Sequence, residues 1–320
     1  MDQRNGTLTT FFIIVGISDL PALQFPIFFL VLFMYFITLG GNIAILLLIC
    51  LDRHLHTPMY FFLGNLSILD ISCSTVTIHK VLFSFVSGDK TISLTVCLAQ
   101  IYVFLSLTCD ELVILTAMSY DRYVAVCNPL RYNVIMNHGM CALLTIVCWI
   151  WGFLISVETF IELTRLTCFR SNKINHFYCD IVPLMKISCN DTSFLEVYIL
   201  IMGLLVVAVI PFLLTFISYV FIIVSIMKIR TNIGRCKAFY TCSSHLTVVI
   251  LIYTTLICQY LRPVSVDTLE SNKFFSLFNT VAVPILNPMI YSLKNKDVKS
   301  AFRKFRCGTQ TKDKRCTRQN

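Results

Sequence analysis

Seven long, mostly apolar stretches run through this 320-residue chain and constrain its fold more than any other feature. They lie at residues 26–50, 58–86, 94–126, 140–161, 196–227, 238–261 and 274–293. Each is long enough to cross a bilayer as a helix, which needs about 20 apolar residues, and a helix pairs its own backbone polar groups in lipid. Charged residues make up only 13% of the chain, against about 25% in soluble domains. The sequence therefore predicts an all-α membrane protein with a seven-transmembrane helix bundle at 26–293, and it excludes a soluble globular domain.

The distribution of basic residues predicts how this bundle sits in the membrane. Seven spans place the two termini on opposite sides. If the N-terminus is outside, 17 of the 26 Lys and Arg residues and four of the 17 acidic residues lie on the inner side, whereas nine basic and ten acidic residues lie outside. Because basic residues concentrate in cytoplasmic loops, we expect residues 1–25 outside and the C-terminus inside. The basic surplus then faces membrane lipid and a cytosolic partner rather than nucleic acid.

The segments that flank the bundle carry a few short motifs. Asn5 begins a glycosylation sequon on the predicted outer side, and Asn190 begins a second candidate there. The first 25 residues lack a basic region followed by a short apolar core, so the first span is expected to act as its own insertion signal. Residues 294–307 predict a short amphipathic helix on the inner membrane surface. Cys307 is a candidate for palmitoylation, and residues 308–320 are expected to form a solvated cytoplasmic tail.

The chain has 15 cysteines, most of them in apolar runs where small buried hydrophobic side chains are expected. Cys97, Cys168, Cys179 and Cys189 lie on the predicted outer side, which is oxidising. Four cysteines allow three pairings, and the sequence alone does not choose among them. The last three lie in a loop at about 162–195, and a loop of that length is usually functional or stapled. No Cys or His pattern indicates a metal site.

Several polar residues lie inside the spans, where an ionisable group costs about 2.5–3.5 kcal/mol on insertion scales. Asn42 and Asp70 lie in the first two spans, and Asn287 lies in the seventh. These three residues predict either a cluster that binds a small cation or a hydrogen-bonded lock between helices. On the third helix one face is shared by Phe104, Thr108, Glu111, Leu112 and Arg122. Asp110 falls nearly opposite that face, so we expect it to form a hydrogen bond to a neighbouring helix.

Two short motifs lie near the predicted inner side. Asp121-Arg122-Tyr123 ends the third span, where Arg122 can pair with Asp121 or bind the carbonyl groups of an inserted partner helix; as a lone triplet it also fits a simple interfacial charge. Asn287-Pro288-Met289-Ile290-Tyr291 ends the seventh span. Pro288 removes a backbone hydrogen bond and kinks the helix. This kink is either a hinge or a proline whose freed carbonyl is satisfied by neighbours.

Together these features resemble a rhodopsin-like G-protein-coupled receptor, and longer strings narrow the resemblance to the vertebrate olfactory receptor family. The resemblance covers about residues 8–306 and is carried by Leu55-His56-Thr57-Pro58-Met59-Tyr60-Phe61-Phe62-Leu63, Met118-Ser119-Tyr120-Asp121-Arg122-Tyr123-Val124-Ala125-Val126-Cys127, Lys237-Ala238-Phe239-Tyr240-Thr241-Cys242-Ser243-Ser244-His245-Leu246 and Pro284-Ile285-Leu286-Asn287-Pro288-Met289-Ile290-Tyr291. Ser119, Tyr240 and Thr254 depart from residues common in the family. Thr254 lies near the expected pocket, so ligand preferences do not transfer directly.

The resemblance implies specific roles for these residues. It pairs Cys97 with Cys179 and Cys168 with Cys189. It assigns Asp70 and Glu111 to a central polar cluster that can hold a sodium ion. The positions that it assigns to the activation switch and G-protein coupling are Asp121, Arg122, Tyr123, Tyr219, His245, Asn287, Pro288 and Tyr291.

The interior of a helix bundle is the usual ligand site. The residues expected to line it are mostly apolar with a few hydroxyls: Phe104, Leu105, Thr108, Cys109, Leu112, Val207, Tyr253, Leu256, Ile257, Tyr260 and Thr280. No carboxylate stands at Phe104, where amine-binding relatives carry Asp, and the seventh span has no central Lys for a retinal Schiff base. These residues favour a small, neutral, mostly apolar ligand.

The resemblance implies an odorant receptor of the plasma membrane. Odorant binding would shift the population toward a state in which the sixth helix swings outward, and a stimulatory G protein would then raise cyclic AMP. Basic residues at Lys228, Arg230, Arg235 and Lys237 would flank its binding mouth. The alternatives are a transporter or channel, which would favour inverted repeats, and a non-olfactory chemoreceptor on the same scaffold. An enzyme is not expected, because no catalytic motif stands out.

Overall fold

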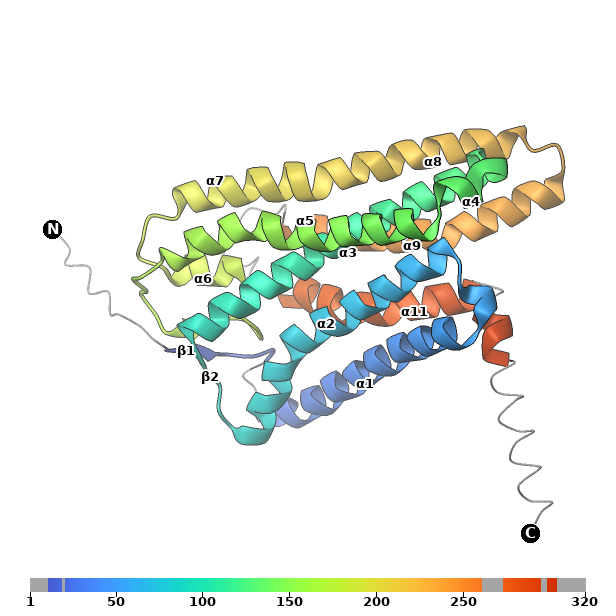
Figure 1. Cartoon of the computed structure of the whole chain (residues 1–320). Coiled ribbons are helices and arrows are strands. Elements are labelled where there is room, and N and C mark those ends of the chain that lie inside the picture. The colour runs from blue at the N-terminus through green and yellow to red at the C-terminus, as the bar shows by residue number, and fades with distance from the viewer. Residues whose placement is uncertain (1–10, 19–20, 261–272, 295–297, 304–320) are drawn as a thin grey trace, which may run out of the picture.

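A computed structural model of the chain describes residues 11–18, 21–260, 273–294 and 298–303. Within these ranges, seven helices are long and apolar enough to cross a membrane, which agrees with the predicted spans. Figure 1 shows these helices packed along one common direction, with strand β1 at one end of the bundle and the last turn of helix α11 at the opposite end. We call the end that carries β1 the sheet end and the other the α4 end.

Most spans extend a few residues beyond the predicted limits, because polar residues continue each helix past the apolar core. The first four spans are α1 (Pro21–Leu51), α2 (Pro58–Ser87), α3 (Leu94–Cys127) and α5 (His138–Thr164). The fifth joins α7 (Ser193–Ile201), a π-helical segment η3 (Met202–Val209) and α8 (Ile210–Lys228). The sixth is α9 (Asn232–Tyr260), and the seventh joins helical residues 273–277, a π-helical segment η4 (Phe278–Ala282) and α11 (Val283–Lys294).

Local sequence signals fix several of these helix ends. Pro58 occupies the first turn of α2, where its missing N–H costs nothing. The side chains of Ser93 and Asn137 cap α3 and α5 by accepting hydrogen bonds from the N–H groups of Val96 and Met140. Gly88 ends α2 with φ 74°, a left-handed conformation that favours glycine.

Short elements connect the spans. At the α4 end they are η1 (Arg53–Leu55), η2 (Pro129–Arg131) and α4 (Tyr132–Ile135). At the sheet end lies α6 (Ile181–Ile187). Of the amphipathic helix predicted at 294–307, residues 298–303 are described and helical, with Val298 buried and Phe302 exposed. Asn5, Cys307 and the tail at 308–320 lie outside the described residues.

A small three-stranded sheet closes the sheet end, and the sequence did not predict it. Its order is β2 (Thr91–Ser93), β1 (Phe11–Ile14), β3 (Lys173–Ile174). β1 runs antiparallel to β2 and parallel to β3, with Phe12 opposite Ile92 and Ile14 opposite Ile174. Phe12 and Ile14 are buried in a core cluster of the sheet end that also contains residues of α3, α5 and α6, whereas Phe11 is exposed. Residues 11–14, which precede the first span, therefore belong to the folded structure.

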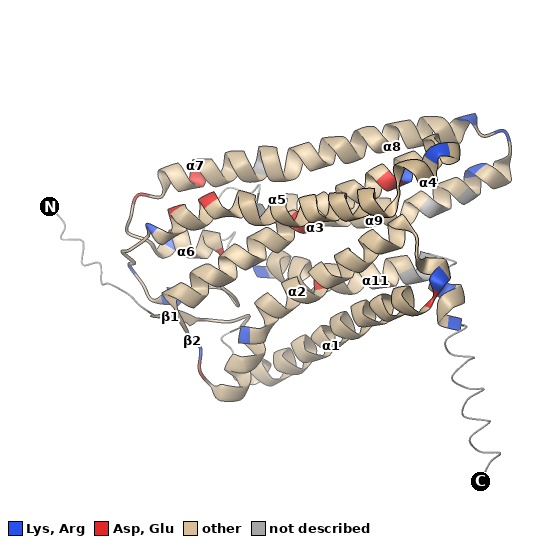
Figure 2. Ribbon diagram, in the orientation of Figure 1, with Lys and Arg blue, Asp and Glu red and all other residues tan. Residues whose placement is uncertain are grey.

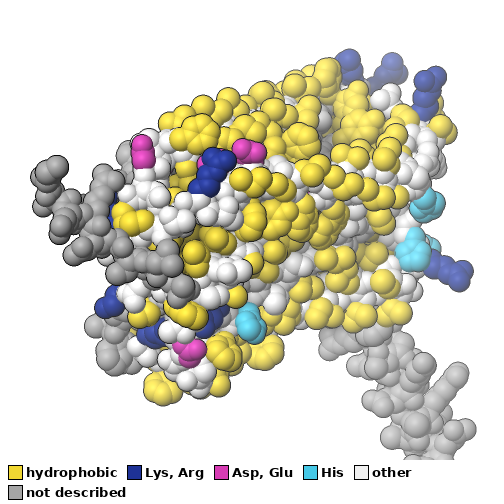
Figure 3. Space-filling view, turned by 60° about the vertical axis from the view of Figure 1, so that its left-hand side comes forward, with side chains coloured by type: hydrophobic (Ala, Val, Ile, Leu, Met, Phe, Trp, Pro, Cys, Tyr) yellow, Lys and Arg dark blue, Asp and Glu magenta, His cyan; other side chains and the backbone are white. Residues whose placement is uncertain are grey.

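The outside of the bundle is apolar, as a lipid-facing surface must be. Phe25, Phe29, Phe33 and Phe36 form a stripe along α1 and are each 62–76% exposed. Hydrophobic side chains cover much of the flank in Figure 3, whereas Lys and Arg gather near the two ends in Figure 2. An exposed apolar surface of this extent is unstable in water and is stable against lipid tails.

Candidate ligand pocket and activation site

The long loop after α5 folds back into the mouth of the bundle. The disulfide Cys97–Cys179 holds it there by joining it to the start of α3, and Cys168–Cys189 links two parts of the loop to each other, which confirms both predicted pairings. Phe177 and Tyr178 immediately precede the first of these bridges and are fully buried in the main core cluster. The ring of Tyr178 lies 5.2 Å from the ring of Phe104 on α3. The loop therefore forms a roof over the predicted ligand residues.

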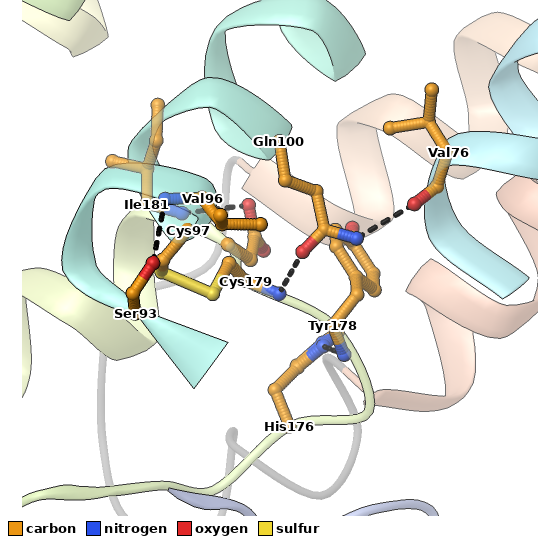
Figure 4. Close-up of a disulfide and its surroundings, with 10 residues drawn as sticks. Val76, Ser93, Val96, Cys97, Gln100, His176, Tyr178, Cys179 and Ile181 are labelled. Carbon is orange, nitrogen blue, oxygen red and sulfur yellow. Dashed lines mark hydrogen bonds between the residues drawn. A yellow bond between two sulfur atoms is a disulfide. The ribbon is translucent and has the colours of Figure 1, made fainter. Parts of the chain in front are cut away.

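Gln100 ties this roof to two helices. Its side-chain carbonyl accepts a hydrogen bond from the N–H of Cys179 at 3.0 Å, and its amide donates to the carbonyl of Val76 on α2 at 2.7 Å. Figure 4 shows Gln100 between Val76 on one side and the Cys97–Cys179 bridge on the other. A single side chain thus fixes α2, α3 and the loop relative to one another.

Burial shifts the pKa values of two titratable loop residues next to the bridge. Burial, followed by the nearby charge of Lys273, lowers the pKa of His176 to about 3. Its Nδ1 accepts a hydrogen bond from the Tyr178 N–H, and its ring packs against those of Phe177 and Tyr178. Burial raises the pKa of Asp180 to about 6, although the N–H of Ile181 partly stabilises the carboxylate. His176 is thus a neutral part of the roof.

Seven of the predicted ligand residues lie inside the bundle. Phe104, Leu112, Tyr253 and Thr280 are buried, and Thr108, Val207 and Leu256 are partly buried. The ring of Tyr253 meets Phe212 of α8 edge-on at 5.3 Å. Its hydroxyl has no hydrogen-bond partner among the described residues, so it offers a donor and an acceptor to a ligand.

The structure corrects or leaves open four other predicted ligand residues. Ile257 is 52% exposed on the outer face of α9, so its prediction is wrong, and Thr254 is exposed as well. The buried stripe of α9 runs through Val248, Ile252 and Thr255, and Ile257, two residues after Thr255, lies about 200° around the helix from it. Cys109 lies against Ser156 of α5, and Leu105 packs against the core cluster of the sheet end, so both point away from the residues around Phe104. The side chain of Tyr260 lies outside the description.

Sequence reasoning missed His176, Phe177 and Tyr178 as part of this site. Of this segment, the sequence analysis used only Cys179, as part of a disulfide. The useful signal was their position, because a residue next to a cysteine bonded to the start of α3 must lie at the mouth of the bundle.

The predicted polar cluster forms in the middle of the bundle. The amide of Asn287 donates to both carboxylate oxygens of Asp70, at 3.0 and 3.1 Å. Glu111 is close enough to both residues to interact with them electrostatically. Its Oε1 and the Oδ1 of Asn287 have no hydrogen-bond partner among the described residues. The cluster thus locks α2 to α11 and still presents unpaired oxygens.

Two polar side chains of the first two helices compensate for prolines in the seventh span. Pro284 has no N–H to pair with the carbonyl of Thr280 four residues earlier, and that carbonyl accepts from the hydroxyl of Ser74 at 3.1 Å. Pro288 likewise leaves the carbonyl of Pro284 free, and that carbonyl accepts from the amide of Asn42 at 3.0 Å. The structure therefore agrees with the second interpretation of Pro288, in which a neighbouring side chain satisfies the freed carbonyl. Asn42 joins α1 to α11 through this hydrogen bond.

This compensation makes Asn42 important for stability. We expect Asn42→Ala to lower the free energy of unfolding by about 1–3 kcal/mol, because the buried carbonyl of Pro284 loses its donor. Thermal unfolding of the purified protein in detergent would measure the change. Ser218→Ala is the matched control, because its hydroxyl donates to Leu214 within the same helix. Equal stability of the two variants would show that the carbonyl finds another partner.

Asp110 lies between α3 and α5, as predicted from its position nearly opposite the face that Phe104 and Thr108 share. Its carboxyl fills the space beside Gly152, where a Cβ would overlap Asp110 and lie 2.5 Å from the Ser106 carbonyl oxygen. Neither carboxylate oxygen has a hydrogen-bond partner in the described part of the chain, so the expected hydrogen bond to a neighbouring helix is not formed.

At the α4 end, Asp121 holds two side chains at once. Arg122 pairs with its Oδ2, through Nε at 3.0 Å and through Nη2 at 2.5 Å. The hydroxyl of Tyr132 on α4 donates to Oδ1 at 2.7 Å. Burial, together with the Asp121 carboxylate, raises the pKa of Tyr132, which therefore remains a hydrogen-bond donor. The guanidinium of Arg122 is held against its own helix.

A second contact at this end joins three helices through His245 of α9. Its Nε2 lies 3.0 Å from the carbonyl of Leu115 on α3 and must donate, because a carbonyl only accepts. In the neutral ring Nδ1 then accepts from the hydroxyl of Tyr219 on α8, at 2.7 Å. Tyr291 of α11 is fully buried, and its hydroxyl has no hydrogen-bond partner among the described residues.

Comparisons with known proteins agree with this geometry. A family model described as olfactory receptor matches residues 31–308. The chain is 45% identical to olfactory receptor 8B3 of Homo sapiens over 304 residues, which cover 95% of this chain and 96% of that protein. It is 44% identical to olfactory receptor 5M5 of Mus musculus, with 95% and 96% covered. Among solved structures, squid rhodopsin matches with a TM-score of 0.73 and 17% identity, covering 90% of this chain and 81% of that one, which shows a shared fold.

Proposed function

The chain belongs to the olfactory receptor family, and from this premise we propose that it binds a small, mostly apolar odorant inside the bundle and raises cyclic AMP through a stimulatory G protein. Members of this family are G-protein-coupled receptors and not enzymes, and a seven-span member is a multi-pass protein of the plasma membrane. The observation that best supports the proposal is that Tyr178 of the loop packs on Phe104 at the mouth of a bundle in which Tyr253 is also buried.

The chemistry of this interior favours a neutral ligand. Its walls are apolar, and its polar groups near Phe104 are the hydroxyls of Thr108 and Tyr253. The Thr108 hydroxyl already donates to the carbonyl of Phe104, so the hydroxyl of Tyr253 is the better partner for a ligand oxygen. A charged ligand would lose its hydration there without a counter-charge.

In the orientation that we propose, the sheet end is extracellular. Both disulfides lie at that end, and disulfides persist in oxidising compartments. The connection between α8 and α9, which carries Lys228, Arg230 and Arg235, lies at the α4 end (Figure 1), where basic residues are expected if that end is cytoplasmic. Asn5 and Asn190 would then be accessible for glycosylation.

Activation would be a population shift between two arrangements of the α4 end. The odorant favours a state in which α9 moves outward and His245 leaves Leu115. Arg122 then leaves Asp121 and, with Tyr219 and Tyr291, lines a cavity for the C-terminal helix of the G-protein α subunit. Leu130 is 99% exposed beside this opening and offers an apolar contact to the same partner.

A cyclic AMP reporter in cells that express the chain with an olfactory-type α subunit tests the proposal. We expect a concentration-dependent response to at least one neutral odorant of a broad panel, and none when the α subunit is omitted. Odorant-evoked signalling through a different G protein would contradict the coupling, and uptake of a solute without signalling would favour a transporter.

We expect His245→Phe to raise signalling in the absence of ligand. The variant loses the hydrogen bonds to Leu115 and Tyr219, which together contribute about 2 kcal/mol, or roughly thirtyfold in the equilibrium between the two states. Basal cyclic AMP, normalised to receptor at the cell surface, would measure the change. His138→Phe is the control, because His138 is exposed on the same side. Unchanged basal signalling in His245→Phe would show that this contact does not restrain α9.

We further propose that Asp70 and Glu111 hold a sodium ion, because hard cations prefer oxygen ligands. The expected result is that sodium chloride stabilises the purified receptor against heating more than choline chloride does. At ten to thirty times the dissociation constant, binding contributes about 1–2 kcal/mol, and Asp70→Asn should remove this difference. Equal stability of the wild type in both salts would leave the cluster as a hydrogen-bonded lock.

A further inference from the structure

A cavity lies on the outside of the bundle, apart from the interior residues proposed to bind the odorant. It lies between α2 and α3 at the sheet end and has a volume of about 530 Å³. The residues of β2 also line it. This volume is in the range of sites that hold one small molecule. Val96 and Phe83, which border it, are 57% and 48% exposed, so the cavity opens toward lipid rather than toward the bundle interior.

The groove exists because small side chains line it and a hydrogen bond fixes its floor. Ala99 and Val103 of α3 face Val76 of α2, and larger residues at these positions would fill the space. Gln100 joins α3 to the carbonyl of Val76 and holds the two helices at a fixed separation (Figure 4). The groove is therefore preformed. From Val103 to Val96 it follows two helical turns, about 10 Å.

One end of the groove is cationic. Lys80 lies there with its ammonium 5.2 Å from the centre of the Phe83 ring. The ring of His79 stacks with the same Phe83 ring, and the two ring centres are 6.4 Å apart. The ammonium donates one hydrogen bond, to the backbone carbonyl of Asp89 at 3.3 Å. An ammonium has three N–H donors, so Lys80 retains donors for a ligand.

The acidic group that faces Lys80 does not cancel its charge completely. The carboxylate of Asp89 accepts hydrogen bonds from the N–H and the hydroxyl of Thr91, at 2.8 and 2.7 Å. These bonds, more than the charge of Lys80, lower the pKa of Asp89. Asp89 contacts Lys80 through its backbone carbonyl rather than through its carboxylate.

We propose that this groove binds a long-chain carboxylate, a free fatty acid, from the leaflet at the sheet end. The acyl chain lies along Val76, Val96 and Val103, and the carboxylate lies at Lys80 and His79. One channel of small-molecule size with one cationic end matches one chain and one anion, whereas a diacyl phospholipid has two chains. The site is separate from the odorant pocket, so its failure would leave the proposed function unaffected.

Photolabelling of the full-length receptor in phosphatidylcholine nanodiscs tests this site. The probe is a palmitic acid that carries a diazirine and an alkyne, and the matched probe is the corresponding alcohol. We expect peptides of α2 and α3 that line the groove to be labelled by the acid about tenfold more than by the alcohol, since a charge-assisted hydrogen bond is lost in the alcohol. Oleate should compete with the labelling.

Two variants test the contacts of the carboxylate and of the acyl chain separately. Lys80→Gln should lower labelling by about tenfold, and Val96→Trp should lower it by filling the groove. The matched controls are Lys173→Gln in β3 and Val147→Trp on the lipid-facing side of α5, and both should label as the wild type does. Odorant-evoked cyclic AMP of each variant confirms that it is folded.

Three results would overturn the assignment. Equal labelling by acid and alcohol, or unchanged labelling of Lys80→Gln, would mean that the cationic end does not recognise the carboxylate. Stronger competition by phosphatidylglycerol than by oleate would identify a phospholipid as the occupant instead.

Discussion

Arg122→Ala is expected to reduce odorant-evoked cyclic AMP to the level of cells without receptor. In the structure the guanidinium is held by Asp121, and in the proposed active state it binds the G-protein helix. Losing a buried, charged contact at an interface costs about 2–5 kcal/mol, which is at least about thirtyfold in affinity. Reporter assays across the full odorant concentration range would measure the loss.

Delivery of this variant to the cell surface should remain intact. Asp121 keeps its hydrogen bond from Tyr132, so the buried carboxylate is not left without a partner. Arg53→Ala is the control, because Arg53 lies in η1 on the same side of the bundle and carries the same charge. A full agonist response in Arg122→Ala, with normal surface expression, would remove Arg122 from the coupling mechanism.

Removal of the Cys97–Cys179 bridge by replacing both residues with alanine should cause the second large effect. This bridge joins residues 82 positions apart, whereas Cys168–Cys189 spans 21. On the chain-entropy estimate the longer loop contributes about 4.5 kcal/mol to the free energy of unfolding and the shorter one about 3.3 kcal/mol. The first double variant should therefore be the less stable of the two.

The two bridges also differ in what they position. Cys179 anchors Tyr178 against Phe104, so loss of the first bridge should additionally weaken the response to odorant. Surface expression by flow cytometry and thermal stability of the purified receptor would compare both double variants with the wild type. If the second pair proved the more damaging, the loop beyond the roof, rather than the roof itself, would dominate stability.

The sequence predicted the spans well because the length and polarity of a membrane helix are imposed by the bilayer. It was less accurate where helices leave the apolar region. α9 begins at Asn232, six residues before the predicted 238, because a helix that extends into water no longer needs apolar residues. The fold class and the two disulfides also followed from sequence, the latter only through resemblance to a family.

The interior of the site was harder to predict, because it depends on contacts between distant segments. Nothing local in the sequence shows that Tyr178 meets Phe104 or that Asn42 donates to Pro284. Ile257 lies one turn after Tyr253, and both were predicted inside the bundle. The buried stripe of α9 passes through Ile252 and Thr255. Tyr253 lies at the edge of this stripe, so a residue one turn further on already faces outward.

The position of β1 has a consequence for how the protein is made. Phe12 and Ile14 leave the ribosome first, yet their partner β2 follows the second span and β3 follows the fourth. Until those segments are synthesised and translocated, the apolar side chains of β1 have no cover. The nascent chain therefore exposes an unpaired apolar strand near its N-terminus during more than half of its synthesis. A lumenal chaperone can bind the strand during that time.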